Sequence, residues 1–282
     1  MYLLSILSRS ARPYLWPAIT VNSILMSAVC GLHLPDCFIL AISLVLCASA
    51  GFLFNDLLDR EIDRANGRKR LQDLSRRGCI MVATCAGASW TLALLMPFLL
   101  TSSGQAIAIL LVALGTAFYS YPIRSIPVVS TIVSALLCTS PIWVPMLIAN
   151  EPTSLTCGLL AASALCLIIG RETILDIRDM EGDRKHGRRT VPVLLGRLVA
   201  VRISQVFVIA SCLIVCPIPF LVDSTMARIL VICAWICYLA FCLIPACQIS
   251  ISGRNSIDAF VRLSSRALLV NIPLICLAML TS

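Results

Sequence analysis

"FILAISLVLCASAGFLFNDLLDREID", residues 38–63, joins a long apolar run to a cluster of acids. Residues 38–54 carry no charged side chain, which is typical of a helix that lies within a membrane. Asp56, Asp59 and Asp63 follow directly, the second and third placed three and seven residues after the first. The stretch therefore predicts an apolar helix that ends in a regularly spaced set of carboxylates.

A related string, "DIRDMEGD" at residues 176–183, ends a second apolar run. Its aspartates, Asp176, Asp179 and Asp183, have the same spacing as those of the first string. On a helix this spacing puts three side chains on one face within two turns. Like charges this close repel one another, so each string predicts a cation against it.

The composition is that of a membrane protein. The chain has 282 residues, of which 59% are hydrophobic and only 13% charged, and its mean hydropathy is +0.96. A soluble domain carries about twice that share of charge. The sequence predicts an all-α polytopic membrane protein, one domain over residues 1–282, with about nine helices around a central cavity. The predicted spans are 14–33, 37–56, 79–101, 104–122, 127–149, 154–176, 200–222, 226–247 and 263–281.

Basic residues gather on one side of this topology. They concentrate before the first span and in two predicted active-site loops, 56–78 and 177–199, whereas the other side holds only Arg228. The positive-inside rule therefore predicts that the N-terminus and both loops are cytoplasmic and that the C-terminus is on the opposite side. Topology and anionic membrane lipids account for the net charge of +8 without a nucleic-acid partner.

The acids favour a magnesium site. Oxygen ligands with no nearby histidine suit Mg²⁺ better than Zn²⁺, and protein-bound Mg²⁺ often shares its coordination with substrate phosphate. Nearby arginines such as Arg184 and Arg189 then neutralise phosphate oxygens. A diphosphate at the mouth of an apolar cavity predicts a polyprenyl diphosphate. The alternative interpretation is a set of membrane-edge ion pairs, for example Asp56 with Arg60.

Residues 55–63 resemble the N-D-x-x-D-x-x-x-D motif of the UbiA superfamily of intramembrane prenyltransferases. "DIRDMEGDRKHGRRTVPVLLG", residues 176–196, resembles the second motif of that family. The resemblance covers nearly the whole chain. It implies Mg²⁺-dependent transfer of a prenyl group from a polyprenyl diphosphate to a lipophilic or aromatic acceptor, through an allylic carbocation. It assigns Asn55 to the substrate and, as metal ligands, Asp56, Asp59, Asp63, Asp176, Asp179 and Asp183.

Two further loops resemble family elements less closely. "YSYPIRSIP", residues 119–127, is similar to a Tyr-x-x-Lys element, which assigns a catalytic role to Tyr121 and Arg124. The loop after the first motif keeps Asn66 and Arg70 as substrate-binding positions but lacks both family prolines. This departure leaves the acceptor unidentified.

Three questions stay open at the level of sequence. The altered loop 67–78 keeps a UbiA-type terpene cyclase as an alternative, in which the cation is quenched without an acceptor. An ion-binding transporter is a remoter alternative, because transporter sites usually lie at the membrane midplane rather than at its edge. Glu172 lies one turn before Asp176, where it either orients a ligand aspartate or pairs with Arg171.

Overall fold

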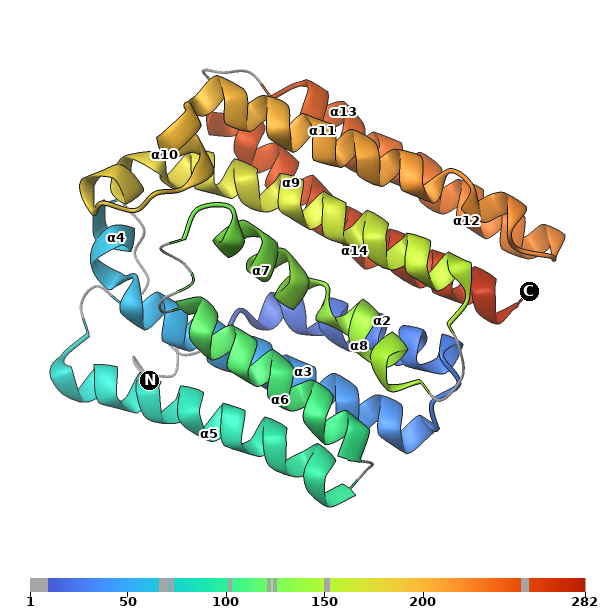
Figure 1. Ribbon diagram of the computed structural model, residues 1–282, viewed down its shortest axis with the longest axis horizontal. Helices are drawn as coiled ribbons and strands as arrows, with labels where there is room; N and C mark the ends of the chain where they lie inside the picture. Colours follow the sequence, from blue (N-terminus) through green and yellow to red (C-terminus); the bar gives the residue numbers. More distant parts are fainter. Residues whose placement is uncertain are drawn as a thin grey trace.

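The computed structural model shows an elongated bundle of helices (Figure 1). It describes residues 10–65, 71, 74–100, 103–120, 123, 126–149, 153–249 and 254–281. Within these ranges every regular element is a helix, which confirms the all-α prediction.

The chain falls into two runs of helices. The first run comprises η1 (Pro13–Leu15), α2 (Trp16–Val29), α3 (Leu34–Leu58), α4 (Arg60–Ala65), α5 (Arg76–Leu100), α6 (Ser103–Ser120), α7 (Val129–Cys138) and α8 (Ser140–Ile148). The second comprises α9 (Leu155–Lys185), α10 (Val191–Leu195), α11 (Arg197–Val215), η3 (Ile218–Phe220), α12 (Thr225–Tyr238), the π-helical η4 (Leu239–Leu243), α13 (Ile244–Cys247) and α14 (Arg254–Leu280).

The helices make the protein a multi-pass membrane protein, but they do not confirm a count of nine spans. In the described part of the chain, six helices are long and apolar enough to cross a membrane. A seventh span results if α7 and α8 are counted together, although they meet at 71°. The sequence predicted one straight span over 127–149; the prolines at 141 and 145, within the first six residues of α8, accompany the break.

The two central helices, α3 and α9, have clear start signals. Pro35 and Asp36 lie in the first turn of α3, where a missing N–H is harmless and a negative charge is favourable. The side chain of Ser154 caps α9 by accepting the Cys157 amide N–H at 3.3 Å. Helix α9 then continues without interruption through Gly182 to Lys185, so the second acidic string is helical throughout.

Helix α9 packs closely against α11 through small residues. A Cβ on Gly170 would lie 3.0 Å from the backbone oxygen of Ser204 and 3.1 Å from Val208. The Ser204 hydroxyl donates to the Gly170 carbonyl at 2.8 Å, and Ser163 donates to the Ser211 carbonyl at 3.0 Å. Small side chains that bond to the facing backbone are a common way to hold membrane helices together.

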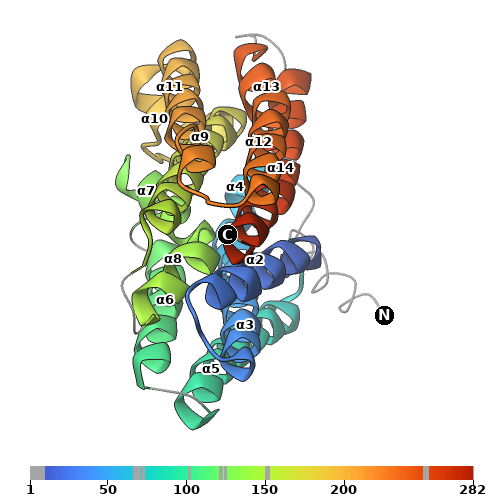
Figure 2. The same cartoon turned by 90° about the vertical axis from the view of Figure 1, so that its right-hand side faces the viewer.

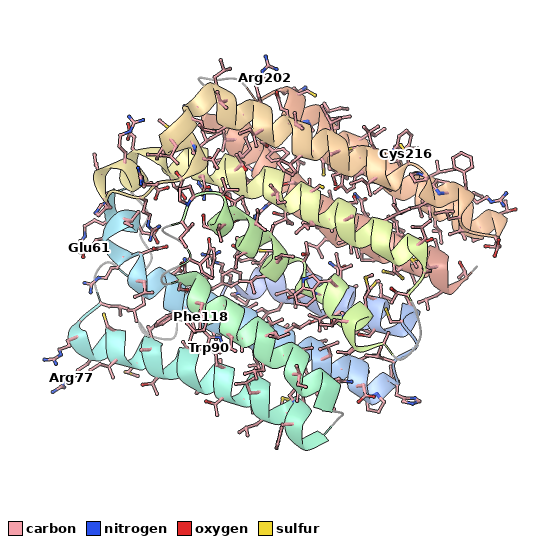
Figure 3. All side chains as sticks on the ribbon, in the orientation of Figure 1. Glu61, Arg77, Trp90, Phe118, Arg202 and Cys216 are labelled. Carbon is pink, nitrogen blue, oxygen red and sulfur yellow. The ribbon has the colours of Figure 1, made fainter. Side chains whose placement is uncertain are left out.

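Both acidic strings lie at the same end of the bundle. Figure 1 shows α4, α10 and the ends of α3 and α9 at this end, and α4 and α10 each contact α9. Glu61 and Arg77 are at this end in Figure 3, whereas the C-terminus lies at the opposite end. The predicted loops 56–78 and 177–199 thus contain helical ends and two short helices. Which end faces the cytoplasm stays a prediction.

Candidate functional site

A cavity of about 380 Å³ opens between the two runs of helices. Its walls come from α2, α3, α6, α7 and α8 of the first run and from α9 and α14 of the second. Viewed along the bundle in Figure 2, these helices surround the middle of the molecule. Apolar side chains such as Leu44, Ile168 and Leu268 line much of it, and Asp59, Asp176, Asp179 and Asp183 line its acidic end.

Arg188 joins the two acidic strings. Its guanidinium forms an ion pair with Asp59 and lies 3.8 Å from Asp183. Only 2% of Asp59 and 3% of Asp183 is exposed, so the contact is made away from bulk water. Burial lowers the pKa of Arg188, while the negative charge of Asp183 acts in the opposite direction. An arginine stays protonated at neutral pH even so.

The end of α9 explains why Arg188 points into the site. Gly187 has φ +69°, a conformation that glycine adopts at little cost, and it reverses the chain. The Arg188 amide N–H then donates to the Asp183 carbonyl at 2.8 Å. This is the backbone pattern of a glycine-terminated helix, and it returns the next side chain toward the last turn.

Arg12 makes a corresponding contact with the first string. It donates to Asp56 at 3.1 Å, and its guanidinium lies 4.2 Å from the centre of the Phe52 ring. Asp56 is 1% exposed. Arg12 has φ +52°, which is unfavourable for a residue with a Cβ, and the pairing with Asp56 favours this conformation.

The remaining motif acids lie close by. Arg178 is 3.5 Å from Asp179 and 3.9 Å from Asp258 of α14. Asp63 is buried at 4% exposure, and its amide N–H donates to the Asp59 carbonyl at 2.8 Å, which keeps α4 in line with the end of α3. The partners of Asp56 and Asp59 come from distant parts of the chain, so these acids are more than locally paired membrane-edge charges.

The other predicted site residues fall into three groups. Asn55 lines the cavity and donates to Asp59 at 3.0 Å. Arg184 and Arg189 are exposed and are not part of the cavity wall. Four lie outside the described residues, and their roles stay predictions: Asn66, Arg70, Tyr121 and Arg124.

Several residues that line the cavity were not among the predicted set. Arg12 was counted only among the basic residues before the first span, and Arg189 was predicted to bind substrate in place of its neighbour Arg188. Tyr119 lines the cavity two residues before the predicted Tyr121. The "GRRT" sequence at 187–190 contains the signal for Arg188, but only the reversal at Gly187 shows which arginine turns inward.

The acidic end fits a hard divalent cation by its chemistry. The carboxylates of both strings and the amide of Asn55 are oxygen donors, the ligand type that Mg²⁺ prefers. Within the described ranges no three His, Cys, Asp or Glu side chains are gathered as a metal-binding group. Arg188 instead lies between Asp59 and Asp183, so a cation shared by the two strings has to replace this guanidinium.

Solved structures with the same fold are known. The UbiA homologue of Aeropyrum pernix K1 superposes with a TM-score of 0.72 at 17% identity, over 94% of this chain and 97% of that one. The UbiA homologue of Archaeoglobus fulgidus bound to DMAPP and Mg²⁺ gives 0.67 at 16% identity, over 95% and 98%.

Sequence comparison gives the family. Digeranylgeranylglyceryl phosphate synthase of Halobacterium salinarum is 34% identical over 182 residues, 63% of this chain and 63% of that protein. The match thus spans less than two thirds of the relative's length. The sequence model of the UbiA prenyltransferase family matches residues 14–265, nearly the whole chain. The protein therefore belongs to the UbiA prenyltransferase family.

Proposed function

We propose that this protein is an Mg²⁺-dependent prenyltransferase that moves a prenyl group from a prenyl diphosphate to a lipophilic acceptor. The observation that carries the proposal is the meeting of the two acidic strings across Arg188, at one end of a cavity that apolar side chains such as Leu44, Ile168 and Leu268 also line. Such a cavity suits an isoprenoid chain, and the acidic end suits a diphosphate with its metal.

The balance of charge supports the need for a metal. Among the residues that the structure describes, five carboxylates and four guanidinium groups line the cavity, and the nearby motif acids Asp56 and Asp63 are buried. Within this described set the negative charges outnumber the positive ones, and an excess of negative charge repels a free diphosphate. Added divalent cations reverse this sign and make the site attractive to the anion.

The residues of the chain then have separable roles. Both acidic strings hold the metal, and Mg²⁺, when bound, neutralises the charge that develops on the diphosphate leaving group. Arg12 and Arg188 lie beside the strings, where a guanidinium can bind phosphate oxygens in a bidentate manner. The apolar walls exclude water from the region where the allylic carbon becomes positive.

The relatives indicate which acceptor to test first. They are named digeranylgeranylglyceryl phosphate synthase, and the structure from Archaeoglobus fulgidus contains DMAPP and Mg²⁺. We propose a mono-prenylated glyceryl phosphate as the acceptor of this chain.

The test is release of diphosphate from geranyl, farnesyl and geranylgeranyl diphosphates by purified protein, with and without Mg²⁺. Asp56→Ala and Asp176→Ala each remove one ligand candidate, and we expect release to fall at least about a hundredfold. Glu61→Gln is the matched control, because Glu61 lies between the motif acids but points outward to Arg64. We expect it to keep the wild-type rate.

The products separate the alternatives. A prenylated acceptor supports the transferase, and a cyclic product formed without acceptor supports the terpene cyclase. If no donor releases diphosphate in Mg²⁺, even after phenolic and glycerophosphate acceptors are added, the proposed function is wrong.

A further inference from the structure

Glu172 is a carboxylate of the cavity wall that belongs to neither acidic string. It lies on α9 one turn before Asp176, and its side chain is 18% exposed. Side chains four residues apart on a helix have Cβ atoms about 5–6 Å apart. The carboxylate is therefore one turn deeper in the cavity than the acids assigned to the metal and the diphosphate.

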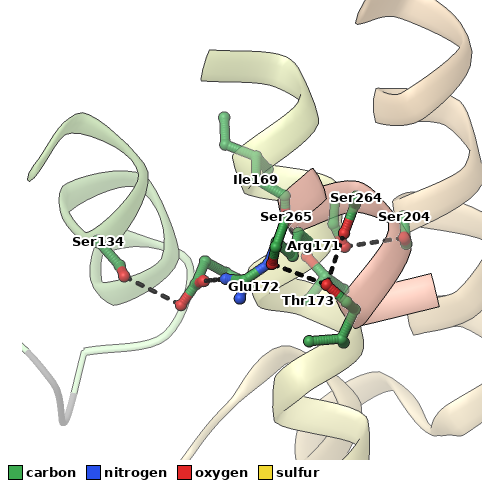
Figure 4. A network of polar contacts seen from close by, with 10 residues as sticks. Ser134, Ile169, Arg171, Glu172, Thr173, Ser204, Ser264 and Ser265 are labelled. Atoms are coloured by element: carbon green, nitrogen blue, oxygen red, sulfur yellow. Dashed lines mark hydrogen bonds and ion pairs between the residues drawn. The ribbon is translucent and has the colours of Figure 1, made fainter. Parts of the chain in front are cut away.

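Two fixed partners orient this carboxylate (Figure 4). Ser134 of α7 donates its hydroxyl to Oε2 at 3.0 Å, and Arg171 donates to Oε1 at 2.8 Å. Figure 4 shows the side chain reaching from α9 across to α7. An ionised carboxylate has about four lone-pair sites, so these two bonds leave room for a further donor.

The surroundings of Glu172 favour a neutral hydrogen-bond donor. Arg171 and Glu172 neutralise each other, so this pair adds no net charge at its depth in the cavity. Hydroxyl groups make the cavity wall more polar, because Tyr119, Ser130 and Ser134 also line the cavity. An uncharged hydroxyl group suits this position better than a second anion.

We propose that Glu172 is the base that accepts the proton of an acceptor hydroxyl, and that the acceptor reacts as an alcohol. The inference rests on the proposed prenyl transfer. The allylic C–O bond breaks and its electron pair leaves with the diphosphate. A lone pair of the acceptor oxygen forms the new C–O bond, the O–H bond breaks, and the proton passes to Glu172, which returns it to solvent after product release.

The test compares two rates in the Glu172→Gln variant. Glutamine keeps the shape of the side chain and can still accept the Ser134 hydrogen bond, but it takes up no proton. We expect prenylation of geranylgeranylglyceryl phosphate to fall about 10²–10⁴-fold. Release of diphosphate without any acceptor, which needs only ionisation of the donor, is expected to stay within about threefold of wild type.

Two variants and one probe serve as controls. Glu172→Asp keeps a base and should recover part of the prenylation rate. Ser134→Ala keeps the carboxylate and loses one hydrogen bond, so its prenylation should fall less than tenfold. An acceptor with its hydroxyl methylated should give no product with the wild-type protein. Melting temperatures in detergent check that each variant is folded.

The outcomes distinguish the two proposals. The base assignment is overturned if Glu172→Gln prenylates within threefold of wild type, or if both of its rates fall by the same factor, since Glu172 then acts on the metal site. If the wild-type protein ionises donors but does not prenylate geranylgeranylglyceryl phosphate, the proposal that the acceptor reacts as an alcohol is overturned. A wild-type protein that ionises no donor overturns the proposed function and the inference with it.

Discussion

Replacing Arg188 with alanine should destabilise the protein most when no metal is present. The change removes the guanidinium from between two carboxylates that are almost fully buried. Breaking a buried ion pair costs about 3–5 kcal/mol, and the Arg188 side chain is 15% exposed, so we expect the lower limit, about 3 kcal/mol. For a chain of 282 residues this corresponds to a fall in Tm of about 5 °C.

Magnesium should recover much of this loss. In the wild-type protein a metal shared by both strings has to displace Arg188, whereas in the Arg188→Ala variant it meets the carboxylates directly. Mg²⁺ should therefore raise the Tm of the variant by several degrees more than that of the wild type. The measurement is thermal unfolding in detergent, once with a chelator and once with millimolar Mg²⁺.

Arg189→Ala provides the matched control, because Arg189 is the neighbouring residue with the same charge but is exposed. Its Tm should change by less than about 1 °C in either condition. The reasoning is refuted if both variants lose the same stability with the chelator, or if Mg²⁺ stabilises Arg188→Ala no more than it stabilises the wild type.

Two further pairs of substitutions test the packing of α9 against α11 and the ion pair between Arg12 and Asp56. Gly170→Ala should cost about 1–3 kcal/mol of unfolding free energy, because the added Cβ meets a backbone oxygen of α11. Gly158→Ala on the same helix meets open space and should be neutral or stabilising. Chemical or thermal unfolding compares the two variants. Arg12→Ala should lower the free energy of unfolding by about 3 kcal/mol, because it leaves Asp56 buried without this guanidinium. Arg12→Lys should recover part of the loss. Equal Tm values for Arg12→Ala and wild type contradict this prediction.

The helical face of the second acidic string could be predicted because its spacing is a local property. Three carboxylates at fixed offsets after an apolar run define one helix face wherever the bundle places it. The shared face of Asp176, Asp179 and Asp183 requires a helix through residue 183, and α9 extends to Lys185. The interruption comes instead in the first string, where α3 ends at Leu58, Asp59 is its C-cap and α4 begins at Arg60.

The cationic half of the site could not be predicted in the same way. Arg12 and Asp56 are 44 residues apart, and Arg188 and Asp59 are 129 residues apart, so their pairing depends on the packing of distant helices. Arginine is frequent at the ends of membrane helices for topological reasons, which hides the few that turn inward. The break between α7 and α8 was missed because hydropathy does not register helix direction, although two prolines mark it.

The contrast between α9 and the α7–α8 pair indicates where the cavity can be redesigned. Helix α9 packs so closely against α11 that a methyl group at Gly170 would lie 3.0 Å from a backbone oxygen, so substitutions that push on it disturb the acidic face as well. The opposite wall is made of two short helices that meet at an angle, with Leu137 and Ile142 on either side of the joint. Substitutions at this joint can enlarge or shorten the apolar compartment and leave the carboxylates in place. A search for variants that accept other chain lengths is best begun there.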